Sequence, residues 1–251
     1  GEGAIEPIDL TFLQALRRLC DESGALLIAD EVQTHWATGY ISVFEDPYFA
    51  NSAKPIKPDV IVTEKANTGD VTPLSVILAR QSIAEIMEPG SDGSKYATNP
   101  VAIEAASATL DMIEEEGLGN LLREKSNKVR AILKKIQEDY PDIVKKITGF
   151  GSILGVEFCD KTSTDKIVKS MMNTTHKNID GLYAKVTKDT ILRLSVNTAM
   201  KNDDLGYLDK ALLMIKNKTF GICQACDQLI HKERLEEVPH TTKCFDCKTN
   251  R

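Results

Sequence analysis

The chain has 251 residues, 42% of them hydrophobic, and a formal net charge of −6 at pH 7. This length allows one sizeable hydrophobic core with a small second domain, or two modest domains. The acidic balance argues against nucleic acid as a direct partner, and no apolar run reaches the roughly 20 residues of a membrane-spanning helix.

The first part of the chain predicts helices that alternate with buried strands. Residues 11–22 place apolar side chains on one face and precede Gly24, which predicts an amphipathic helix with a glycine stop. That face comprises Phe12, Leu13, Leu16 and Leu19. Three short apolar runs follow, typical of strands buried on both faces of a parallel sheet, at residues 25–29, 59–63 and 75–79. With a further helix over residues 81–87, this region is predicted to be α/β.

Two long helices and a second, smaller α/β domain are predicted next. Residues 101–116 and 118–139 have helical periodicity, and the second segment carries charges at helical spacing, which is typical of a linker between domains. Residues 145–158 and 190–196 contain short β-rich runs around the glycines of residues 149–151. The two isolated cysteines, Cys20 and Cys159, lie in apolar segments and are expected to be reduced core thiols. The N-terminus has no basic, apolar leader, so we expect a cytoplasmic protein.

The C-terminal segment contains two Cys-x-x-Cys pairs separated by seventeen residues. The four cysteines are Cys223, Cys226, Cys244 and Cys247. This spacing is typical of a tetrahedral zinc site, and four thiolates leave no open coordination position, so the ion is expected to be structural. A pair of redox dithiols is the alternative. The four histidines, of which His35 is the first, show no competing ligand spacing and are expected on the surface or in loops.

Residues 203–248 resemble the DksA/TraR family. The match comprises a helix at residues 205–217, the entry to the finger at residues 219–223, and Arg234, Leu235 and Pro239 between the cysteine pairs. The resemblance implies a bound structural zinc ion and a candidate partner in RNA polymerase, which DksA-like regulators reach with an acidic-tipped coiled coil. No such coiled coil precedes this finger in the sequence.

Asp30 and Lys65 follow the first two predicted strands. Ligands gather at the carboxyl ends of strands in open parallel sheets, so this acid and this amine are candidates to face one crevice. A lysine can form a Schiff base with an aldehyde, and a carboxylate can keep a pyridine nitrogen protonated. Together they suggest a site for pyridoxal 5'-phosphate (PLP). The alternatives are a helix cap for Asp30 and a solvated loop charge for Lys65.

Residues 1–200 resemble the C-terminal, lysine-bearing half of class III PLP-dependent aminotransferases. The two most specific motifs are at residues 12–34, which end in Asp-Glu-Val-Gln-Thr, and at residues 58–65. The match continues at Pro73 and Leu74, at Asn99 and Pro100, and at residues 149–158 and 192–194. This resemblance implies a partial large-domain sheet of fold type I at residues 1–100, and linker helices and a small α/β domain at 101–202. The DksA/TraR resemblance adds a helix with the zinc finger at 203–251.

The same resemblance implies roles for individual residues. Lys65 would bind the PLP aldehyde and transfer the proton at the donor carbon, while Asp30 would pair with the pyridine nitrogen. Val32 would pack on the ring face, and Gln33 would lie near the phenolic oxygen. Ser94 and Lys95 stand near the position of the family's phosphate-binding threonine, and Arg193 stands where a substrate carboxylate is commonly bound.

The sequence also departs from the family. Residue 1 matches a point inside the family's large domain, so the first half of an ordinary aminotransferase has no counterpart here, and a homodimer or a complementary chain is expected to complete the site. Residues 35–39 and 67–71 replace segments that are glycine-rich in the family. Three hypotheses follow: an enzyme that transfers an amino group from an amino donor to an oxo acid, a zinc-finger module acting on RNA polymerase with a vestigial scaffold, and a non-functional remnant.

Overall fold

The computed structural model describes residues 5–51, 55–91, 99–161, 164, 184–200, 225, 228, 246 and 247. These residues form two units, which are described separately. Unit 1 contains the described residues from 7 to 124, and unit 2 contains residues 5–6 and those from 125 onward. None of the helices in the described ranges combines the length and the apolar character that crossing a membrane requires.

Unit 1 begins with helix α1, Leu10–Ser23. Asp9 caps its first turn, because Oδ1 accepts a hydrogen bond from Phe12 N at 3.1 Å. Gly24 ends the helix in the left-handed conformation, with φ 72°. The predicted helix is therefore confirmed, but only part of its apolar face is covered: Leu13 is 5% exposed, whereas Phe12 is 59% exposed.

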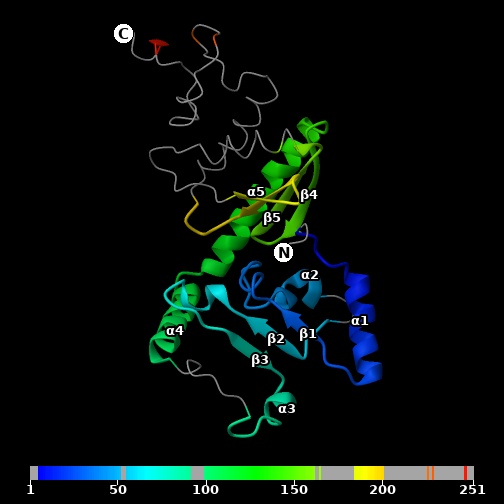
Figure 1. The fold of residues 1–251 in the computed structure, drawn as a ribbon, viewed down its shortest axis with the longest axis vertical. Coiled ribbons are helices and arrows are strands. Elements are labelled where there is room, and N and C mark those ends of the chain that lie inside the picture. The colour runs from blue at the N-terminus through cyan, green and yellow to red at the C-terminus, as the bar shows by residue number, and fades with distance from the viewer. Residues whose placement is uncertain are drawn as a thin grey trace. The chain divides into compact units, whose positions relative to one another are not determined.

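The sheet of unit 1 has three strands in the order β1-β2-β3 (Figure 1). They are β1 (Ile28–Asp30), β2 (Val60–Thr63) and β3 (Val76–Ala79). β1 is parallel to β2, as predicted, but β3 is antiparallel to β2, so the prediction of a third parallel strand is wrong. The physical reason is the connection from β2 to β3, which contains only one short 3-10 helix and turns. A parallel return usually runs through an α-helix that crosses one face of the sheet, and residues 64–75 form no such helix.

The prediction that these strands are buried on both faces is also wrong for the described residues. In β1, Ile28 is 59% exposed, and in β3, Ile77 is 67% exposed. Apolar runs of this kind normally face covering elements on both sides of a sheet. β1 and β3 therefore present apolar side chains that unit 1 itself does not cover.

The remaining elements of unit 1 are short, apart from one helix. They are a 3-10 helix (Val43–Glu45), α2 (Pro47–Ala50), a second 3-10 helix (Lys65–Thr68), α3 (Gln81–Ala84) and α4 (Pro100–Glu115). The predicted helix at residues 81–87 is a single turn, while that at residues 101–116 is confirmed as α4. Asn99 caps α4, and this helix packs against the second 3-10 helix.

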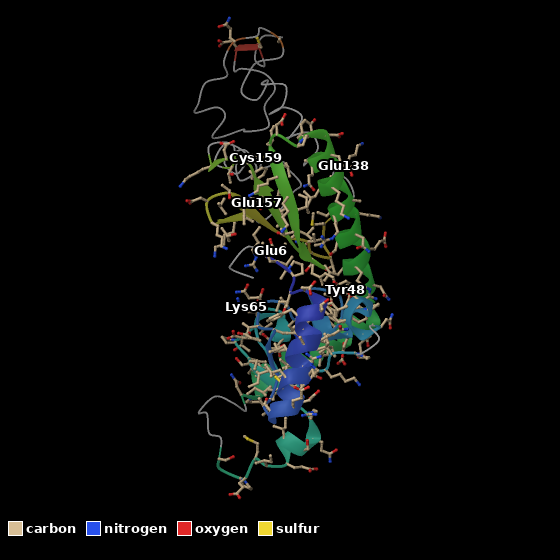
Figure 2. All side chains as sticks on the ribbon, turned by 90° about the vertical axis from the view of Figure 1, so that its right-hand side faces the viewer. Glu6, Tyr48, Lys65, Glu138, Glu157 and Cys159 are labelled. Atoms are coloured by element: carbon tan, nitrogen blue, oxygen red, sulfur yellow. The ribbon has the colours of Figure 1, made fainter. Side chains whose placement is uncertain are left out.

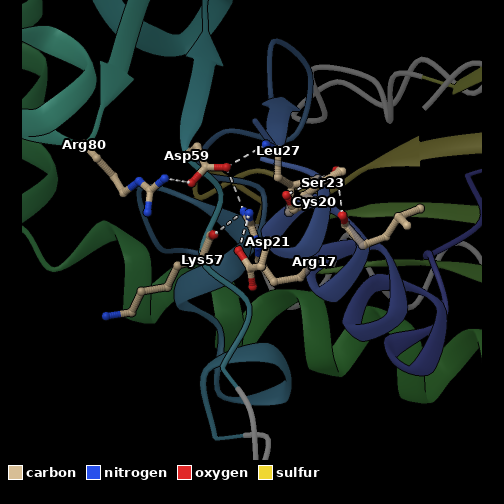
Figure 3. A network of polar contacts seen from close by, with 9 residues as sticks. Arg17, Cys20, Asp21, Ser23, Leu27, Lys57, Asp59 and Arg80 are labelled. Carbon is tan, nitrogen blue, oxygen red and sulfur yellow. Dashed lines mark hydrogen bonds and ion pairs between the residues drawn. The ribbon is translucent and has the colours of Figure 1, made fainter. Parts of the chain in front are cut away.

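Asp59 anchors the starting end of β2 (Figure 3). Its side chain is 1% exposed, and Oδ2 accepts hydrogen bonds from Arg17 Nη1 at 2.8 Å and from Leu27 N at 2.6 Å. Arg80 forms an ion pair with the other carboxylate oxygen. Burial alone would raise the pKa of Asp59, but the hydrogen bond from Leu27 and the two guanidinium groups lower it. This carboxylate therefore ties α1 to the beginnings of β1 and β2.

Unit 2 is a four-stranded antiparallel sheet with the order β4-β5-β7-β6. Its elements are the later part of α5 (Leu118–Asp139), β4 (Val144–Phe150), β5 (Ile153–Phe158), β6 (Ala184–Thr187) and β7 (Ile191–Ser195). Side chains of α5 and of the strands form one core, which includes Val129, Leu133, Ile136, Leu154, Val156 and Leu192. The predicted helix at residues 118–139 and the β-rich runs are confirmed, whereas β6 was not predicted.

The two isolated cysteines differ in exposure. Cys20 in α1 is 8% exposed, so its prediction as a buried thiol is confirmed. Cys159 is exposed, and its prediction as a core thiol is wrong (Figure 2). It directly follows the last residue of β5, where the alternation that buries Phe158 turns the next side chain outward. The α/β class is confirmed for the chain as a whole.

Candidate functional site

The carboxyl ends of β1 and β2 lie side by side, because the strands are parallel and Asp30 pairs with Val62. Glu31 N donates to Val62 O at 2.9 Å, so the pairing extends one residue beyond β1. β2 ends at Thr63, and Lys65 follows after one residue. The segments that carry Asp30 and Lys65 thus leave the sheet at one edge, where ligands gather in open parallel sheets. That the two groups share one bound ring stays a prediction.

Three of the predicted cofactor contacts lie at the end of β1 and on the turn after it. Asp30 is exposed, while Val32 and Gln33 are half-buried. Asp30 Oδ1 accepts a hydrogen bond from Val32 N at 3.1 Å. The turn is closed by His35 N, which donates to Glu31 O at 2.9 Å. The orientation of the Asp30 carboxylate is therefore linked to the shape of this turn.

Glu31 is a buried carboxylate to which sequence reasoning gave no role. It is 2% exposed, and its two oxygens accept from Ser42 Oγ at 2.5 Å and from Val43 N at 2.9 Å. Burial raises the pKa of Glu31, although these two hydrogen bonds partly oppose the shift. Successive residues of a strand point to opposite faces, so an acid directly after Asp30 points away from it. Glu31 thus clamps the loop that runs from the turn back to residues 42 and 43.

Lys65 is the first residue of the second 3-10 helix of unit 1 and is exposed (Figure 2). Its backbone is in the left-handed region, with φ 49°, a conformation that costs a residue with a side chain roughly 1–2 kcal/mol. Strained backbone of this kind is concentrated at functional sites and persists where neighbours hold it. The neighbour here is Asn67, whose Nδ2 donates to Thr63 Oγ1 at 3.2 Å and to Leu74 O at 2.9 Å.

His35 lies in the loop after β1, as the sequence predicted, but it is half-buried. Its Nδ1 lies 2.8 Å from Ile41 O, and its ring is tilted against Trp36 with centroids 5.3 Å apart. Burial lowers the pKa of His35, although hydrogen bonds with Ile41 and Asn67 partly oppose the shift. The contact of His35 with Ile41 thus closes the loop between residues 35 and 41.

The tip of this loop meets the first turn of α5 so closely that no side chain fits between them. A Cβ on Gly39 would lie 2.3 Å from Gly119 O, and Gly39 has φ 78°. Arg123 Nη1 donates to Gly39 O at 2.8 Å, and its guanidinium lies 4.3 Å from the centre of the Tyr40 ring. The loop after β1 is therefore fixed at both its base and its tip.

The other predicted contacts of PLP and substrate are distributed elsewhere. Ser94 and Lys95 lie outside the described residues. Arg193 is in β7 of unit 2, where it is half-buried and paired in register with Gly155 and Lys185. Its role in binding a substrate carboxylate stays a prediction.

The zinc ligands fall at the C-terminal end. Cys223, Cys226 and Cys244 lie outside the described residues, whereas Cys247 is half-buried and follows Asp246 in a short helical turn. A set of four thiolates in two Cys-x-x-Cys pairs fits a structural zinc ion. Individual ligand assignments stay predictions.

Comparisons with known proteins identify both parts of the chain. Residues 1–216 match the family model of class III aminotransferases, and residues 218–250 match the prokaryotic dksA/traR C4-type zinc finger. Ornithine aminotransferase 2 of Staphylococcus aureus is 33% identical over 217 residues, which cover 86% of this chain and 50% of that protein. The mitochondrial ornithine aminotransferase of Oryza sativa is 31% identical, covering 83% of this chain and 42% of its own length.

Solved structures of aminotransferases are also similar to this chain. An ornithine aminotransferase from Plasmodium yoelii aligns with a TM-score of 0.70 at 26% identity, covering 86% of this chain and 55% of that one. An acetylornithine aminotransferase from Elizabethkingia anophelis aligns with a TM-score of 0.66 at 28% identity, covering 81% and 51%. The chain thus spans about half the length of the curated relatives it matches. The predicted fusion is confirmed: the chain belongs to the class III aminotransferase family and carries a C4 zinc finger of the dksA/traR type.

Proposed function

We propose that this chain supplies the lysine-bearing part of a PLP-dependent aminotransferase, which transfers an amino group from an amino donor to an oxo acid. The observation that supports this most is the parallel pairing of β1 and β2, because it brings the segments of Asp30 and Lys65 to one edge of a sheet. The family to which residues 1–216 belong uses PLP. An amine and a carboxylate at one such edge fit the aldehyde and the pyridine nitrogen of this cofactor.

Four residues of unit 1 would act on the cofactor and the reacting carbon. Bound PLP supplies an electron sink for the carbon that loses its proton. The Lys65 amine binds the cofactor aldehyde and, once released, removes or returns that proton. The Asp30 carboxylate keeps the pyridine nitrogen protonated. Val32 packs on one face of the ring, and the Gln33 amide lies near the phenolic oxygen.

The remaining contacts concern the phosphate and the substrate. Ser94 and Lys95 would bind the phosphate, the lysine as a point charge, and Arg193 would bind a substrate carboxylate through two parallel hydrogen bonds. The amino donor is a basic amino acid of the ornithine kind, since relatives at 33% and 31% identity are ornithine aminotransferases. The reaction is expected to take place in the cytoplasm.

Activity would require protein beyond the described residues. The chain spans about half of its relatives, and the sheet of unit 1 exposes large apolar residues, with Ile77 at 67% and Ile28 at 59%. Apolar strand faces of this kind are normally covered. We infer that a second copy of the chain or a complementary chain with the remaining large-domain sequence completes the site.

The direct test is to trap PLP on the full-length chain. We expect a visible absorption band on addition of PLP, and reduction with borohydride should fix the cofactor on Lys65, as shown by peptide mass spectrometry. Lys65→Ala should abolish both signals. Lys57→Ala is the matched control, because Lys57 is an exposed lysine of the same unit and its side chain has no proposed role.

The experiment is done with the chain alone and with a co-expressed segment that carries the other half of the large domain. A band that depends on Lys65 in either case supports the proposal. If neither preparation gives a signal that disappears in Lys65→Ala, the aminotransferase proposal fails, and the similarity reflects ancestry alone.

A second candidate function rests on the zinc-finger match at residues 218–250. In this view the finger docks on a protein, with RNA polymerase as the candidate partner, and the aminotransferase part is a scaffold. Metal analysis should find about one zinc ion per chain, lost in Cys223→Ser/Cys226→Ser. Capture of purified RNA polymerase by the full chain, but not by this double variant, would support the module. No capture by either would exclude this partner.

A further inference from the structure

Three residues of the segment between β2 and β3 have a left-handed backbone, although only one of them is a glycine. They are Lys65 with φ 49°, Gly69 with φ 57° and Asp70 with φ 65°. Glycine adopts this conformation freely, whereas residues with a side chain avoid it. Residues 67–71 also replace a segment that is glycine-rich in the family. The conformation at Lys65 must therefore be held by contacts rather than permitted by glycines.

The backbone hydrogen bonds of this segment are long. Asn67 N lies 3.4 Å from Glu64 O, and Gly69 N lies 3.4 Å from Ala66 O. Bonds between amide and carbonyl groups in proteins are typically about 2.9–3.0 Å long, and they weaken beyond that distance. The 3-10 helix of Lys65–Thr68 thus gains little stability from its own backbone, as is common for short helices of this type.

The Asn67 side chain bridges the two ends of the segment. Its Nδ2 donates to Thr63 Oγ1 at 3.2 Å and to Leu74 O at 2.9 Å, so both amide protons are used. The Thr63 hydroxyl in turn donates to Val76 O at 3.3 Å. Asn67 therefore joins the end of β2, which precedes Lys65, to the residues that lead into β3. A glycine at position 67 would provide neither of the two bonds.

Thr68 closes the rest of the segment. Its Oγ1 donates to Thr72 O at 2.5 Å and accepts from Thr72 N at 3.4 Å. Helix α4 packs against this 3-10 helix, and all three side chains are buried: Thr68 and Thr63 are 1% exposed, and Asn67 is 9% exposed. Water therefore competes little for these hydrogen bonds, and a buried polar network of this kind makes the structure rigid.

We propose that Asn67 is a positioning residue, which together with Thr63 and Thr68 holds the backbone of Lys65 in the conformation that its reaction with PLP requires. The proposal rests on the proposed function, because Lys65 is the candidate PLP lysine. A reacting amine that is already oriented does not have to be ordered at the moment of reaction. In this chain, buried side-chain hydrogen bonds fix a backbone for which the family uses glycines.

The first test is amide hydrogen exchange with mass spectrometry on the full-length chain without cofactor. Asn67→Leu keeps a side chain of similar size but removes both hydrogen bonds, so exchange in residues 65–72 should rise about 10-fold or more. Asn51→Leu is the matched control, because Asn51 is exposed in the same unit, and it should leave this exchange unchanged. Residues 13–20 of α1 show in each variant whether unit 1 remains folded. No rise in Asn67→Leu would overturn the proposal.

Thr63 provides a milder pair of variants, which decides the matter if Asn67→Leu unfolds unit 1. Thr63→Val has nearly the same shape without the hydroxyl and should raise exchange in residues 65–72 about 5-fold. Thr63→Ser keeps the hydroxyl and should raise it less than about twofold. In the double variant Asn67→Leu/Thr63→Val the rise should be smaller than the product of the two single rises, because both changes break one bond. Equal exchange in Thr63→Val and Thr63→Ser, or fully multiplicative effects, would overturn the network.

Attachment of PLP provides the second readout. Where borohydride fixes PLP on Lys65 in the native chain, the rate of attachment should fall about 10-fold in Asn67→Leu, stay unchanged in Asn51→Leu, and be higher in Thr63→Ser than in Thr63→Val. An unchanged rate in Asn67→Leu would contradict the positioning role. Absence of fixation in the native chain would count against the aminotransferase proposal alone, because the exchange experiment judges the network without any cofactor.

Discussion

The two units contain apolar strands of similar composition, yet they differ in how those strands are covered. In unit 2, Leu154 is 0% exposed and Leu192 is 1% exposed, because α5 packs over the antiparallel sheet. In unit 1, Ile28 and Ile77 are 59% and 67% exposed. Unit 2 therefore covers its strands with its own helix, whereas β1 and β3 of unit 1 keep large apolar side chains exposed.

The largest expected effect tests the core of unit 2. Leu154→Ala removes a fully buried side chain and should lower the free energy of unfolding by about 2–5 kcal/mol. Ile77→Ala, in the exposed part of unit 1, should change it by less than about 0.5 kcal/mol. Urea unfolding followed by circular dichroism measures both. Equal losses for the two variants would show that the strands of the two units do not differ in how they are covered.

The next effect concerns the anchor of unit 1. Asp59→Asn leaves Arg17 and Arg80 without their buried partner. We expect it to lower the free energy of unfolding by about 3 kcal/mol. Trp36 is the single tryptophan of the chain and lies in unit 1, so its fluorescence reports unfolding there. Asp21→Asn is the control, because Asp21 also pairs with Arg17 but its side chain is 65% exposed. It should cost less than about 1 kcal/mol.

Acid should abolish the difference in stability against unfolding between the native chain and Asp59→Asn. The pKa of Asp59 is lowered in the folded state, so its contribution is complete above the ordinary carboxyl range, near pH 4, and is lost as the pH falls through the lowered value. Unfolding midpoints of the two proteins should therefore converge in acid. A constant difference down to pH 2 would mean that the charge of Asp59 is not what anchors the strand.

A smaller effect is expected at the loop of the candidate site. Gly39→Ala combines a left-handed backbone with a contact at 2.3 Å to Gly119 O, and should cost about 1–3 kcal/mol. Gly24→Ala is the matched control, because Gly24 has φ 72° and nothing lies within 4 Å of the position that its Cβ would occupy. It should cost about 1 kcal/mol. Trp36 fluorescence in urea measures both variants. Gly39→Ala should lower the free energy of unfolding more than Gly24→Ala, and the reverse order would contradict the prediction.

The smallest effect on stability is expected on the exposed strand of unit 1. Ile77→Thr keeps a β-branched side chain and should change the free energy of unfolding by less than about 0.5 kcal/mol. It should nevertheless weaken self-association, measured by sedimentation velocity, because it removes part of an exposed apolar face. Unchanged association would indicate that this face is not a contact surface between copies.

The helices were the most predictable part of the fold. Periodic apolar positions and a glycine stop defined α1, and the pattern of residues 118–139 matches the bounds of α5. Strand direction was less accessible, because it depends on the connection: residues 64–75 between β2 and β3 form no crossover α-helix. Burial of the strands depends on elements that cover them, which the apolar runs themselves do not specify.

For the site, the motifs indicated Asp30 and Lys65 but not the residues that hold them. Glu31 lies inside a recognised motif, and its burial with Ser42 depends on how the loop folds back eleven positions later. Asn67 lies two positions after the lysine, and its bonds to Thr63 and Leu74 depend on how the chain turns between β2 and β3.

β2 has four residues, with the Asp59 anchor directly before it and Lys65 two positions after its end. Strand residues alternate between faces, so an insertion or deletion of one residue in β2 would turn the remaining residues of the strand to the opposite faces and shift the lysine by about 3.3 Å along the strand. Natural length variation among relatives is therefore expected to stop at the borders of this strand.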